Sequence, residues 1–393
     1  MTKKSDAPAI RFKGFSDAWE QRKLGDVVKE ITRNDPESEA PIMMITANNG
    51  FIEQSERYAF NNAGESLKKY ILLKKGELAY NHGASKLRPY GSCFALTTAE
   101  NARIPFVYHC FSAENQNAEF MSIELNGAEI ENQLRKIVSS GARMDGLLNI
   151  SFDEYTSVSV ILPGTEEQDR IADFFRHLDN LITLHQRKFE KLTNVKKSML
   201  EKMFPQNGSS YPKIRFKGFT DPWEQRKVQD VADRFDNLRI PVAANLRVHG
   251  TTPYYGANGI QDYVEGFTHD GEFVLVAEDG ANDLKNYPVK CVNGRIWVNN
   301  HAHILQGKAG IADNSFLAFA ISQSDIESLL VGGGRAKLNA ETLMSIEFRL
   351  PCLQEQYRIG EYLTQLDHLI TLHQRELEKL QNIKKSMLEK MFV

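Results

Sequence analysis

The chain has 393 residues, of which 41% are hydrophobic and 25% are charged, and its formal net charge at pH 7 is −3. A chain of this length is expected to form two or more domains. The near-neutral charge excludes a generally basic nucleic-acid-binding protein, although a local basic patch can still contact phosphates. No stretch approaches about 18 consecutive apolar residues, the start lacks an apolar signal segment, and the four cysteines are scattered. We therefore expect a soluble cytoplasmic protein.

The chain contains two long internal repeats. Residues 10–23 return as residues 214–227 and differ at only two of fourteen positions. Residues 162–204 return as residues 350–392, with 28 of 43 positions identical. The middle segments between these repeats share no alignable identity. Constant ends with divergent middles predict one scaffold that presents two different recognition surfaces.

The first middle segment, residues 24–160, contains a loop at residues 81–90 that combines amide, glycine, basic and aromatic residues. This composition suits phosphate contacts and the reading of base edges, where Arg or Lys pairs with guanine and Asn with adenine. A Gly-rich basic loop, residues 139–143, precedes a predicted strand at residues 158–162. A solvated surface loop is the alternative in each case. The predicted DNA contacts here are Ser85, Lys86, Arg88, Tyr90 and Arg143.

The most regular segment is Glu166–Met203, where apolar residues fall at a three–four spacing. This spacing predicts a helix with a narrow apolar seam. Thr165 and Gln168 have the spacing of a capping box, and Pro205 is expected to end the helix. At about 1.5 Å per residue, the predicted helix is about 57 Å long.

Residues 350–393 repeat this seam, so the two helices are each other's obvious partners. We expect an antiparallel intramolecular coiled coil, in which two equivalent histidines fix the register rather than bind a metal. The alternative is that each helix packs only on its own domain. The predicted interface residues are Leu178, Leu181, His185, Leu192, Leu366, Leu369, His373 and Leu380.

A turn-rich linker, residues 205–213, leads into the second repeat of the arm. The second middle segment contains short apolar runs such as Glu272–Ala277, which are typical of strands. Its loop at residues 278–285 begins with carboxylates, which could accept hydrogen bonds from cytosine amino groups. A Gly-rich basic loop at residues 332–337 follows, and both loops have a solvated surface as the alternative. The predicted DNA contacts are Asn282, Lys285, Arg335 and Lys337.

Catalytic motifs are missing from the sequence. It has no Gly-x-x-x-x-Gly-Lys-Ser/Thr phosphate loop, no Asn/Asp-Pro-Pro-aromatic methyltransferase motif and no Gly-x-Ser-x-Gly elbow. Asp283 and Lys285 resemble a nuclease fragment but lack a second acid. His301 and His303 have the spacing of a metal pair without a third ligand nearby, so we favour a structural role. We expect no catalytic residue, metal or cofactor in this chain.

Several motifs together resemble one known family. They are Trp19-Glu-Gln-Arg-Lys-Leu-Gly-Asp26, Leu-Pro-x-x-x-Glu-Gln-x-Arg-Ile at residues 162–171 and 350–359, and Leu-Ile-Thr-Leu-His-Gln-Arg in both long helices. Pro253-Tyr-Tyr-Gly-Ala-Asn-Gly-Ile260 and Trp297-Val-Asn-Asn-His-Ala-His303 are similar to segments of one type of target recognition domain. Over essentially its full length, the chain resembles the specificity (S) subunits of type I restriction-modification systems.

The residues and the resemblance together indicate an α+β protein. Two mixed α/β target recognition domains are expected to be joined by two long antiparallel helices with pseudo-two-fold symmetry. The expected domains are a first recognition domain with its arm, a first long helix, a linker, a second recognition domain and a second long helix, at residues 1–161, 162–204, 205–213, 214–349 and 350–393.

The resemblance also implies partners. A specificity subunit is non-catalytic, binds double-stranded DNA and two methyltransferase (M) subunits, and is joined by restriction (R) subunits. S-adenosylmethionine, ATP and magnesium would then belong to the partner subunits. Each middle segment would read one half of a split DNA site, and the helices would set the spacing. Two alternatives remain open: a specificity-like subunit of a bifunctional type II system, and a coiled-coil adaptor without DNA readout.

Overall fold

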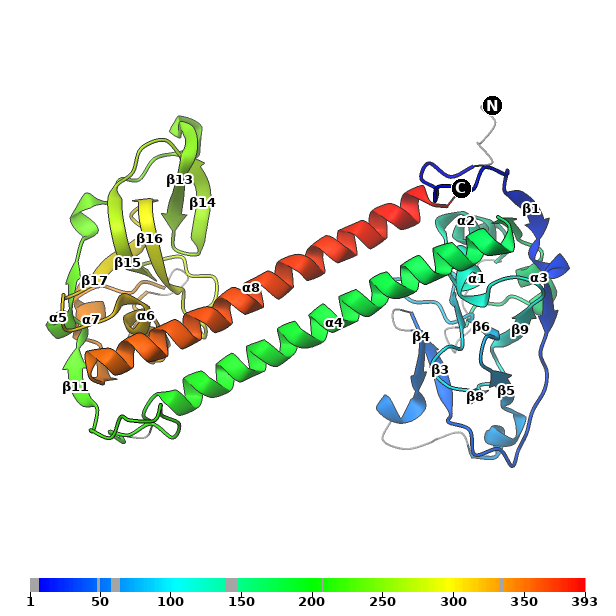
Figure 1. The fold of residues 1–393 in the computed structure, drawn as a ribbon, viewed down its shortest axis with the longest axis horizontal. Coiled ribbons are helices and arrows are strands. Elements are labelled where there is room, and N and C mark those ends of the chain that lie inside the picture. Colours follow the sequence, from blue (N-terminus) through cyan, green and yellow to red (C-terminus); the bar gives the residue numbers. More distant parts are fainter. Residues whose placement is uncertain are drawn as a thin grey trace. The chain divides into compact units, whose positions relative to one another are not determined.

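The computed structural model describes residues 7–47, 50–57, 64–138, 147–206, 208–332 and 336–392. The chain divides into two compact units. The first unit combines residues 1–184 with residues 377–393, and the second unit spans residues 185–376. Each of the two long helices therefore contributes one part to each unit (Figure 1).

The first unit is built on an antiparallel four-stranded sheet with the order β2-β9-β6-β7. Its strands are β2 (Val28–Glu30), β6 (Leu78–Asn81), β7 (Ser92–Ala95) and β9 (His109–Ala113). The smaller antiparallel pairs are β1 (Glu20–Lys23) with β10 (Ser159–Leu162), β3 (Met43–Thr46) with β4 (Gly50–Glu53), and β5 (Ile71–Lys74) with β8 (Asn101–Ile104). The helices of this unit are α1 (Ala118–Leu125), α2 (Ala128–Ile137) and α3 (Phe152–Thr156), with 3-10 turns η1 (Leu24–Asp26), η2 (Gln54–Glu56) and η3 (Gly64–Lys69).

The second unit contains a six-stranded sheet with the order β12-β17-β15-β16-β13-β14. Its strands are β12 (Ala232–Arg234), β13 (His249–Gly256), β14 (Gly259–Val264), β15 (His269–Ala277), β16 (Val289–Val298) and β17 (Ala302–Gly307). Neighbouring strands are antiparallel except β13 and β16, which are parallel. A separate antiparallel pair joins β11 (Glu224–Lys227) to β18 (Glu347–Leu350). The short helices are α5 (Val228–Val231), α6 (Asn314–Ser322) and α7 (Ala340–Ser345), with η4 (Asp236–Leu238), η5 (Ala244–Leu246) and η6 (Glu327–Leu329).

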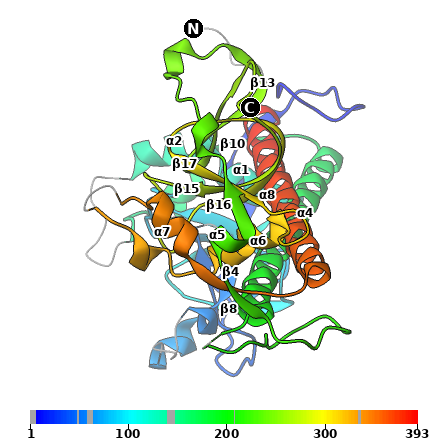
Figure 2. The ribbon, with the colours of Figure 1, turned by 90° about the vertical axis from the view of Figure 1, so that its left-hand side faces the viewer.

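One helix lies against the sheet in each unit, and the two helices begin in the same way. Asn117 caps α1 by accepting a hydrogen bond from the main-chain N–H of Phe120, and Asp313 caps α6 through Phe316. The α6 helix packs against β15 and β16 (Figure 2). Both helices bury apolar side chains, including Phe120 and Met121 of α1 and Phe316 and Leu317 of α6, and so contribute to the core of their unit.

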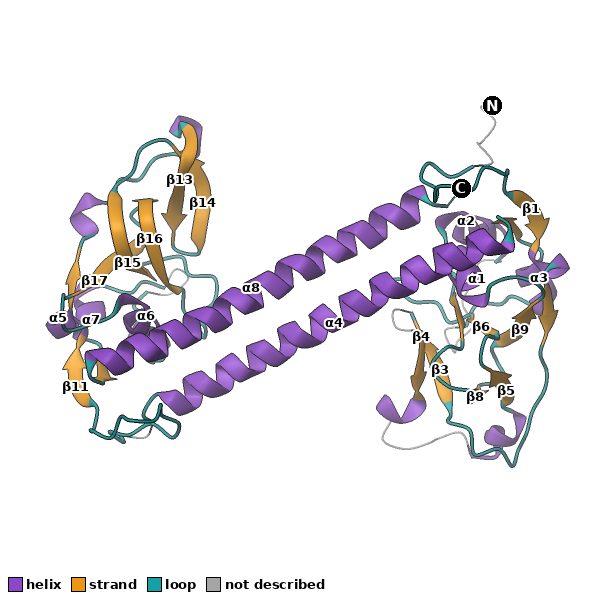
Figure 3. Ribbon diagram, viewed as in Figure 1, coloured by secondary structure: helices purple, strands orange, loops and turns teal. Residues whose placement is uncertain are grey.

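The expected α+β fold and the two long helices are confirmed (Figure 3). The helix α4 spans Thr165–Met203 and α8 spans Leu353–Lys390. In the first unit the two helices run antiparallel, with Asp179 of α4 paired to Lys384 of α8 at 2.5 Å. In the second unit Lys196 pairs with Asp367 in the same way at 2.5 Å. None of the helices in the described part of the chain combines the length and hydrophobicity needed to cross a membrane.

The seam between the helices differs from the prediction at two positions. Leu178 and Leu366 are buried, but Leu181 and Leu369 are 45% and 40% exposed. The neighbouring isoleucines, Ile182 and Ile370, are half-buried instead. The apolar seam therefore runs one residue further along each helix at this turn, and Leu181 and Leu369 lie outside it. Leu192 and Leu380, the remaining predicted seam leucines, are half-buried.

The start of α4 also differs from the predicted capping box. Thr165 is the first residue of the helix. The side chain of Gln168 is fully buried and donates to the carbonyl of Pro163 at 2.9 Å while accepting from the main-chain N–H of Asn117 at 3.0 Å. Gln168 therefore ties the start of α4 to the cap of α1 rather than closing a local box.

Candidate nucleic-acid interface

The two loops that the sequence singled out connect equivalent strands. In the first unit the sheet order is β2-β9-β6-β7, and the second unit contains the same order as β12-β17-β15-β16. Residues 81–90 lie at and after the end of β6 and lead into β7, and residues 278–285 join β15 to β16. The same hairpin loop of the same four-stranded frame is thus polar in both units. The two loops share Gly-Ala-x-x-Leu at residues 83–87 and 280–284 and differ at most other positions.

The loop of the first unit is folded onto itself. Ser85 donates its N–H to the carbonyl of Arg88 at 3.0 Å, and its hydroxyl accepts from the N–H of Arg88 at 3.0 Å. The guanidinium of Arg88 donates to the carbonyl of Asn126 at 2.8 Å, so Arg88 also anchors the loop to the end of α1. The carbonyl of Tyr90 accepts from the hydroxyl of Tyr80 at 2.6 Å. Lys86 is exposed in this loop.

Each hairpin loop is joined to residues at or just after the end of the Gly-rich loop of its unit. Gly83 forms an antiparallel bridge with Leu147, and Asp279 forms one with Lys337. Main-chain hydrogen bonds reinforce both joints, from Leu148 to His82 at 2.9 Å and from Leu338 to Glu278 at 2.7 Å. The structure thus brings together segments more than 50 residues apart in each unit. The predicted contacts Arg143 and Arg335 lie outside the described residues.

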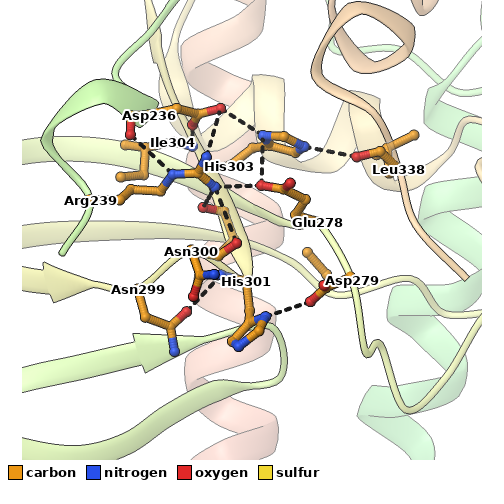
Figure 4. Close-up of polar contacts among 12 residues, drawn as sticks. Asp236, Arg239, Glu278, Asp279, Asn299, Asn300, His301, His303, Ile304 and Leu338 are labelled. Carbon is orange, nitrogen blue, oxygen red and sulfur yellow. Dashed lines mark hydrogen bonds and ion pairs between the residues drawn. The ribbon is translucent and has the colours of Figure 1, made fainter. Parts of the chain in front are cut away.

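At the start of the second loop lies a network of half-buried charges (Figure 4). The carboxylate of Glu278 accepts from Arg239 at 2.5 Å and pairs with Lys337 at 2.8 Å. Burial alone would raise the pKa of Glu278, but the hydrogen bonds from Lys337 and Arg239 outweigh it and lower that pKa. Because Glu278 is engaged by two cations, it is not available for the cytosine contact that the sequence suggested. The predicted contact Lys337 is half-exposed and already holds an anion.

The two histidines of the suspected metal pair have oxygen partners. The Nδ1 of His303 lies 2.7 Å from a carboxylate oxygen of Asp236, and its Nε2 lies 2.9 Å from the carbonyl of Leu338. The Nδ1 of His301 lies 2.5 Å from Asp279 (Figure 4). No group of three or more potential metal ligands occurs in the part of the chain that the structure describes. Both histidines therefore join the start of strand β17 to the loops around it.

The other two predicted contacts, Asn282 and Lys285, are exposed in the loop between β15 and β16. One residue that holds this loop was missed by the sequence reasoning. Asn258, in the turn between β13 and β14, donates to the carbonyl of Gly280 and accepts from the N–H of Asn282, both at 2.9 Å. The turn sequence Gly-Ala-Asn-Gly signalled a tight turn, but nothing local to it indicated a contact more than 20 residues away.

The two seam histidines meet inside the second unit. The Nδ1 atoms of His185 and His373 lie 3.1 Å apart, and the rings are packed edge to face. Next to this pair each helix carries two exposed leucines at identical places in the repeat, Leu181 and Leu184 on α4 and Leu369 and Leu372 on α8. The histidines thus lie in the predicted interface, whereas the four leucines face outward.

The structure thus consists of two α+β units with the same four-strand order, a polar loop cluster in each unit and two long helices that both units share. Residues 220–382 match the family described as type I restriction modification DNA specificity domain. The matched residues lie within the second repeat of the chain, and the chain is similar to specificity subunits of type I restriction enzymes.

Three similar proteins illustrate this relationship. A putative type I restriction enzyme specificity subunit of Haemophilus influenzae is 44% identical over 146 residues, which cover 37% of this chain and 38% of that protein. The MjaVIII specificity subunit of Methanocaldococcus jannaschii is 22% identical over 286 residues, which cover 64% of this chain and 65% of that protein. The chain thus spans less than two thirds of the length of each of these curated relatives.

The structural comparison extends over the whole chain. The crystal structure of a type I restriction-modification S subunit from M. genitalium matches with a TM-score of 0.66 at 12% sequence identity, and the match covers 98% of this chain and 99% of that one. At this identity the likeness concerns the fold.

Proposed function

We propose that this chain is the DNA sequence-recognition subunit of a type I restriction-modification complex, in which each unit reads one half of a bipartite DNA site. The observation that carries this proposal is the equivalence of the two hairpin loops. The same position of the same frame holds a polar loop in both units, joined to the residues after a Gly-rich basic loop. The side chains differ between the loops, as two different half-sites require.

Catalysis belongs, in this proposal, to the partner subunits. Methyltransferase subunits would bind S-adenosylmethionine and modify adenine, and restriction subunits would use ATP and magnesium. The net charge of −3 fits such a complex, because the partners can share the phosphate contacts.

Replacing residues 24–160 by the corresponding segment of another specificity subunit tests the division of labour. Mapping methylated adenines in cells that carry the chimaera should show one half of the recognition sequence changed and the other half unchanged. A change in both halves, or methylation without sequence preference, would contradict the proposal of two independent readers.

The repeats also suggest where two identical methyltransferase subunits dock. Identical partners need identical surfaces, and the exposed leucines Leu181 and Leu184 on α4 recur as Leu369 and Leu372 on α8, each 40% to 46% exposed. Exposed leucines one turn apart on a helix are typical of an interaction surface. We expect one methyltransferase subunit to be bound through each pair.

A double substitution, Leu181→Asp with Leu184→Asp, should therefore reduce the number of bound methyltransferase subunits from two to one. Analytical ultracentrifugation of the reconstituted complex would measure this stoichiometry. Thr183→Asp, on the same exposed turn, is the matched control and should retain both subunits. Retention of two subunits by the leucine variant would reject this surface.

We further propose that the helix pair sets the spacer between the half-sites. Inserting seven residues at equivalent points of α4 and α8 keeps the seam and adds about 10 Å to each helix. The spacer should then lengthen by about three base pairs, at ~3.4 Å per base pair. Unchanged spacing in the methylated motif would show that another element sets the distance.

A further inference from the structure

The loop between β15 and β16 of the second unit is held in one conformation from two sides. On one side Asn258 forms two hydrogen bonds of 2.9 Å, donating to the carbonyl of Gly280 and accepting from the N–H of Asn282. Gly280 has a φ of +72°, which side chains other than glycine rarely adopt. On the other side Leu338 donates to the carbonyl of Glu278 at 2.7 Å.

The second half of the loop is fixed by its own carboxylate. Asp283 accepts hydrogen bonds from the main-chain N–H groups of Lys285 at 3.0 Å and Asn286 at 2.9 Å, and from the side-chain amide of Asn286 at 2.9 Å. These hydrogen bonds, above all that from the N–H of Asn286, lower the pKa of Asp283, so the carboxylate stays charged and the turn stays closed. Asp283 is thereby committed to shaping the loop.

The base of the loop is polar and equally ordered. His301 lies 2.5 Å from Asp279, and the main-chain N–H of His301 is held by Asn299 at 2.8 Å (Figure 4). With its backbone fixed at the base and along both halves, the loop exposes two functional side chains, the carboxamide of Asn282 and the ammonium of Lys285. A loop that is ordered before binding loses little conformational entropy when it binds.

We propose that this loop reads two neighbouring base pairs of the second half-site, with Asn282 recognising an adenine and Lys285 a guanine. A carboxamide can donate to N7 and accept from N6 in the manner that distinguishes adenine, and an ammonium can donate to both O6 and N7 of guanine in the major groove. Asn258 is a positioning residue that holds Asn282 from behind. The inference rests on the proposed function, since it assigns bases to the loop of one reader.

The test uses the full chain assembled with the methyltransferase subunit of its host, and its readout is the methylated motif together with DNA binding. Asn282→Ala should relax one adenine position of the second half-site, and Lys285→Ala should relax an adjacent guanine position. Binding of the original site should fall roughly 5- to 150-fold in each case. The first half-site should stay unchanged.

The positioning role predicts a graded series. Asn258→Ala removes both hydrogen bonds and should relax both positions together, whereas Asn258→Asp keeps the acceptor for Asn282 and should give an intermediate loss. A structural defect alone would lower thermal stability and binding to all sequences without broadening two particular positions. Asn293→Ala removes an exposed carboxamide from β16 and serves as the matched control with an unaltered motif.

Three outcomes would overturn the inference. An unchanged motif with both Asn282→Ala and Lys285→Ala would mean that the loop does not read bases. Equal weakening on all sequences would assign Lys285 to a phosphate. Relaxation of the first half-site would place the loop on the wrong part of the DNA. Failure of the proposed function itself looks different, because the wild-type assembly would then methylate no specific sequence.

Discussion

The two units use identical residues to join their arms to the long helices, whereas their sheets and loops are built mostly from different residues. In the first unit Arg11 forms a two-bond pair with the buried Glu167 at 2.6 and 2.7 Å. In the second unit Arg215 forms the same pair with the buried Glu355 at 2.7 and 2.8 Å. Internal sequence identity thus marks the residues that join each arm to the start of a long helix.

The two middle segments show the opposite relationship, because similar structure is formed by different sequences. They share little identity beyond Gly-Ala-x-x-Leu at residues 83–87 and 280–284, yet both contain the same four-strand order. The second unit adds the hairpin β13–β14, whose turn carries the Asn258 that fixes the neighbouring loop. Topology can therefore persist on any suitable pattern of apolar residues, whereas a buried ion pair requires particular side chains.

The largest effect is expected from separating the repeats. A fragment of residues 1–208 lacks Met391 and Phe392, which complete the core of the first unit. Residues 196–204 are identical to residues 384–392, so a second copy of the fragment can supply the same side chains. We expect an isologous dimer, measurable by sedimentation at tens of micromolar, that methylates a symmetric sequence when M is present. A folded monomer would contradict this pairing.

The next largest effect concerns the arms. Arg215→Ala leaves the buried carboxylate of Glu355 without its partner, which should destabilise the second unit by about 3–5 kcal/mol. Arg11→Ala should destabilise the first unit by a similar amount, because the geometry is the same. Denaturant unfolding with a probe in each unit would measure both. Clearly unequal losses would show that identical arms are not equivalent in energy.

Two basic residues of the loop at residues 81–90 should respond differently to substitution. Lys86→Ala should weaken recognition of the first half-site by ~1–3 kcal/mol if Lys86 contacts a base, and leave stability unchanged. Arg88→Ala should in addition loosen the loop, because it removes the hydrogen bond to Asn126. DNA-binding measurements on the assembled complex, paired with thermal unfolding, separate the two effects. A silent Lys86→Ala variant would place the reading surface elsewhere.

The smallest effect should be a loss of helix pairing in acid. Desolvation, followed by the nearby His185 and Lys188, lowers the pKa of His373 from its ordinary value. A histidine with a lowered folded-state pKa stabilises the fold above the unfolded pKa of about 6.5 and loses that contribution as pH falls. Protonation of both rings would also place hydrogens on the two Nδ1 atoms, which lie 3.1 Å apart. Unfolding curves at pH 7.5 and 5 should therefore differ less for His373→Leu than for the wild type.

The sequence predicted the long helices because a three–four spacing over many turns has one structural interpretation. It misplaced Leu181 and Leu369 because each helix carries adjacent apolar residues there, Leu181-Ile182 and Leu369-Ile370, and either choice satisfies the spacing. Only the folded helices distinguish the two choices, because Leu181 and Leu369 are exposed and the adjacent isoleucines are half-buried.

The two loops were predicted from composition, but their equivalence was not, although Gly-Ala-x-x-Leu recurs in both at residues 83–87 and 280–284. The strand order itself depends on contacts between distant segments. For the same reason the pairing of Glu278 with Arg239 and Lys337, and the role of Asn258, had no local signal. From the sequence alone, charged residues in a loop indicate a solvated or DNA-binding surface, because their partners within the fold are not known.

The first unit is assembled from two segments that are distant in the sequence, and this matters during synthesis on the ribosome. Residue 392 emerges 208 residues after residue 184, which at roughly 5–20 residues per second is an interval of about 10–40 s. During this interval the site for Met391 and Phe392, beside Trp19 and Phe120, is open. Other nascent chains on the same messenger carry the same two side chains as their Met203 and Phe204. Neighbouring chains can therefore exchange helices before each completes its own first unit.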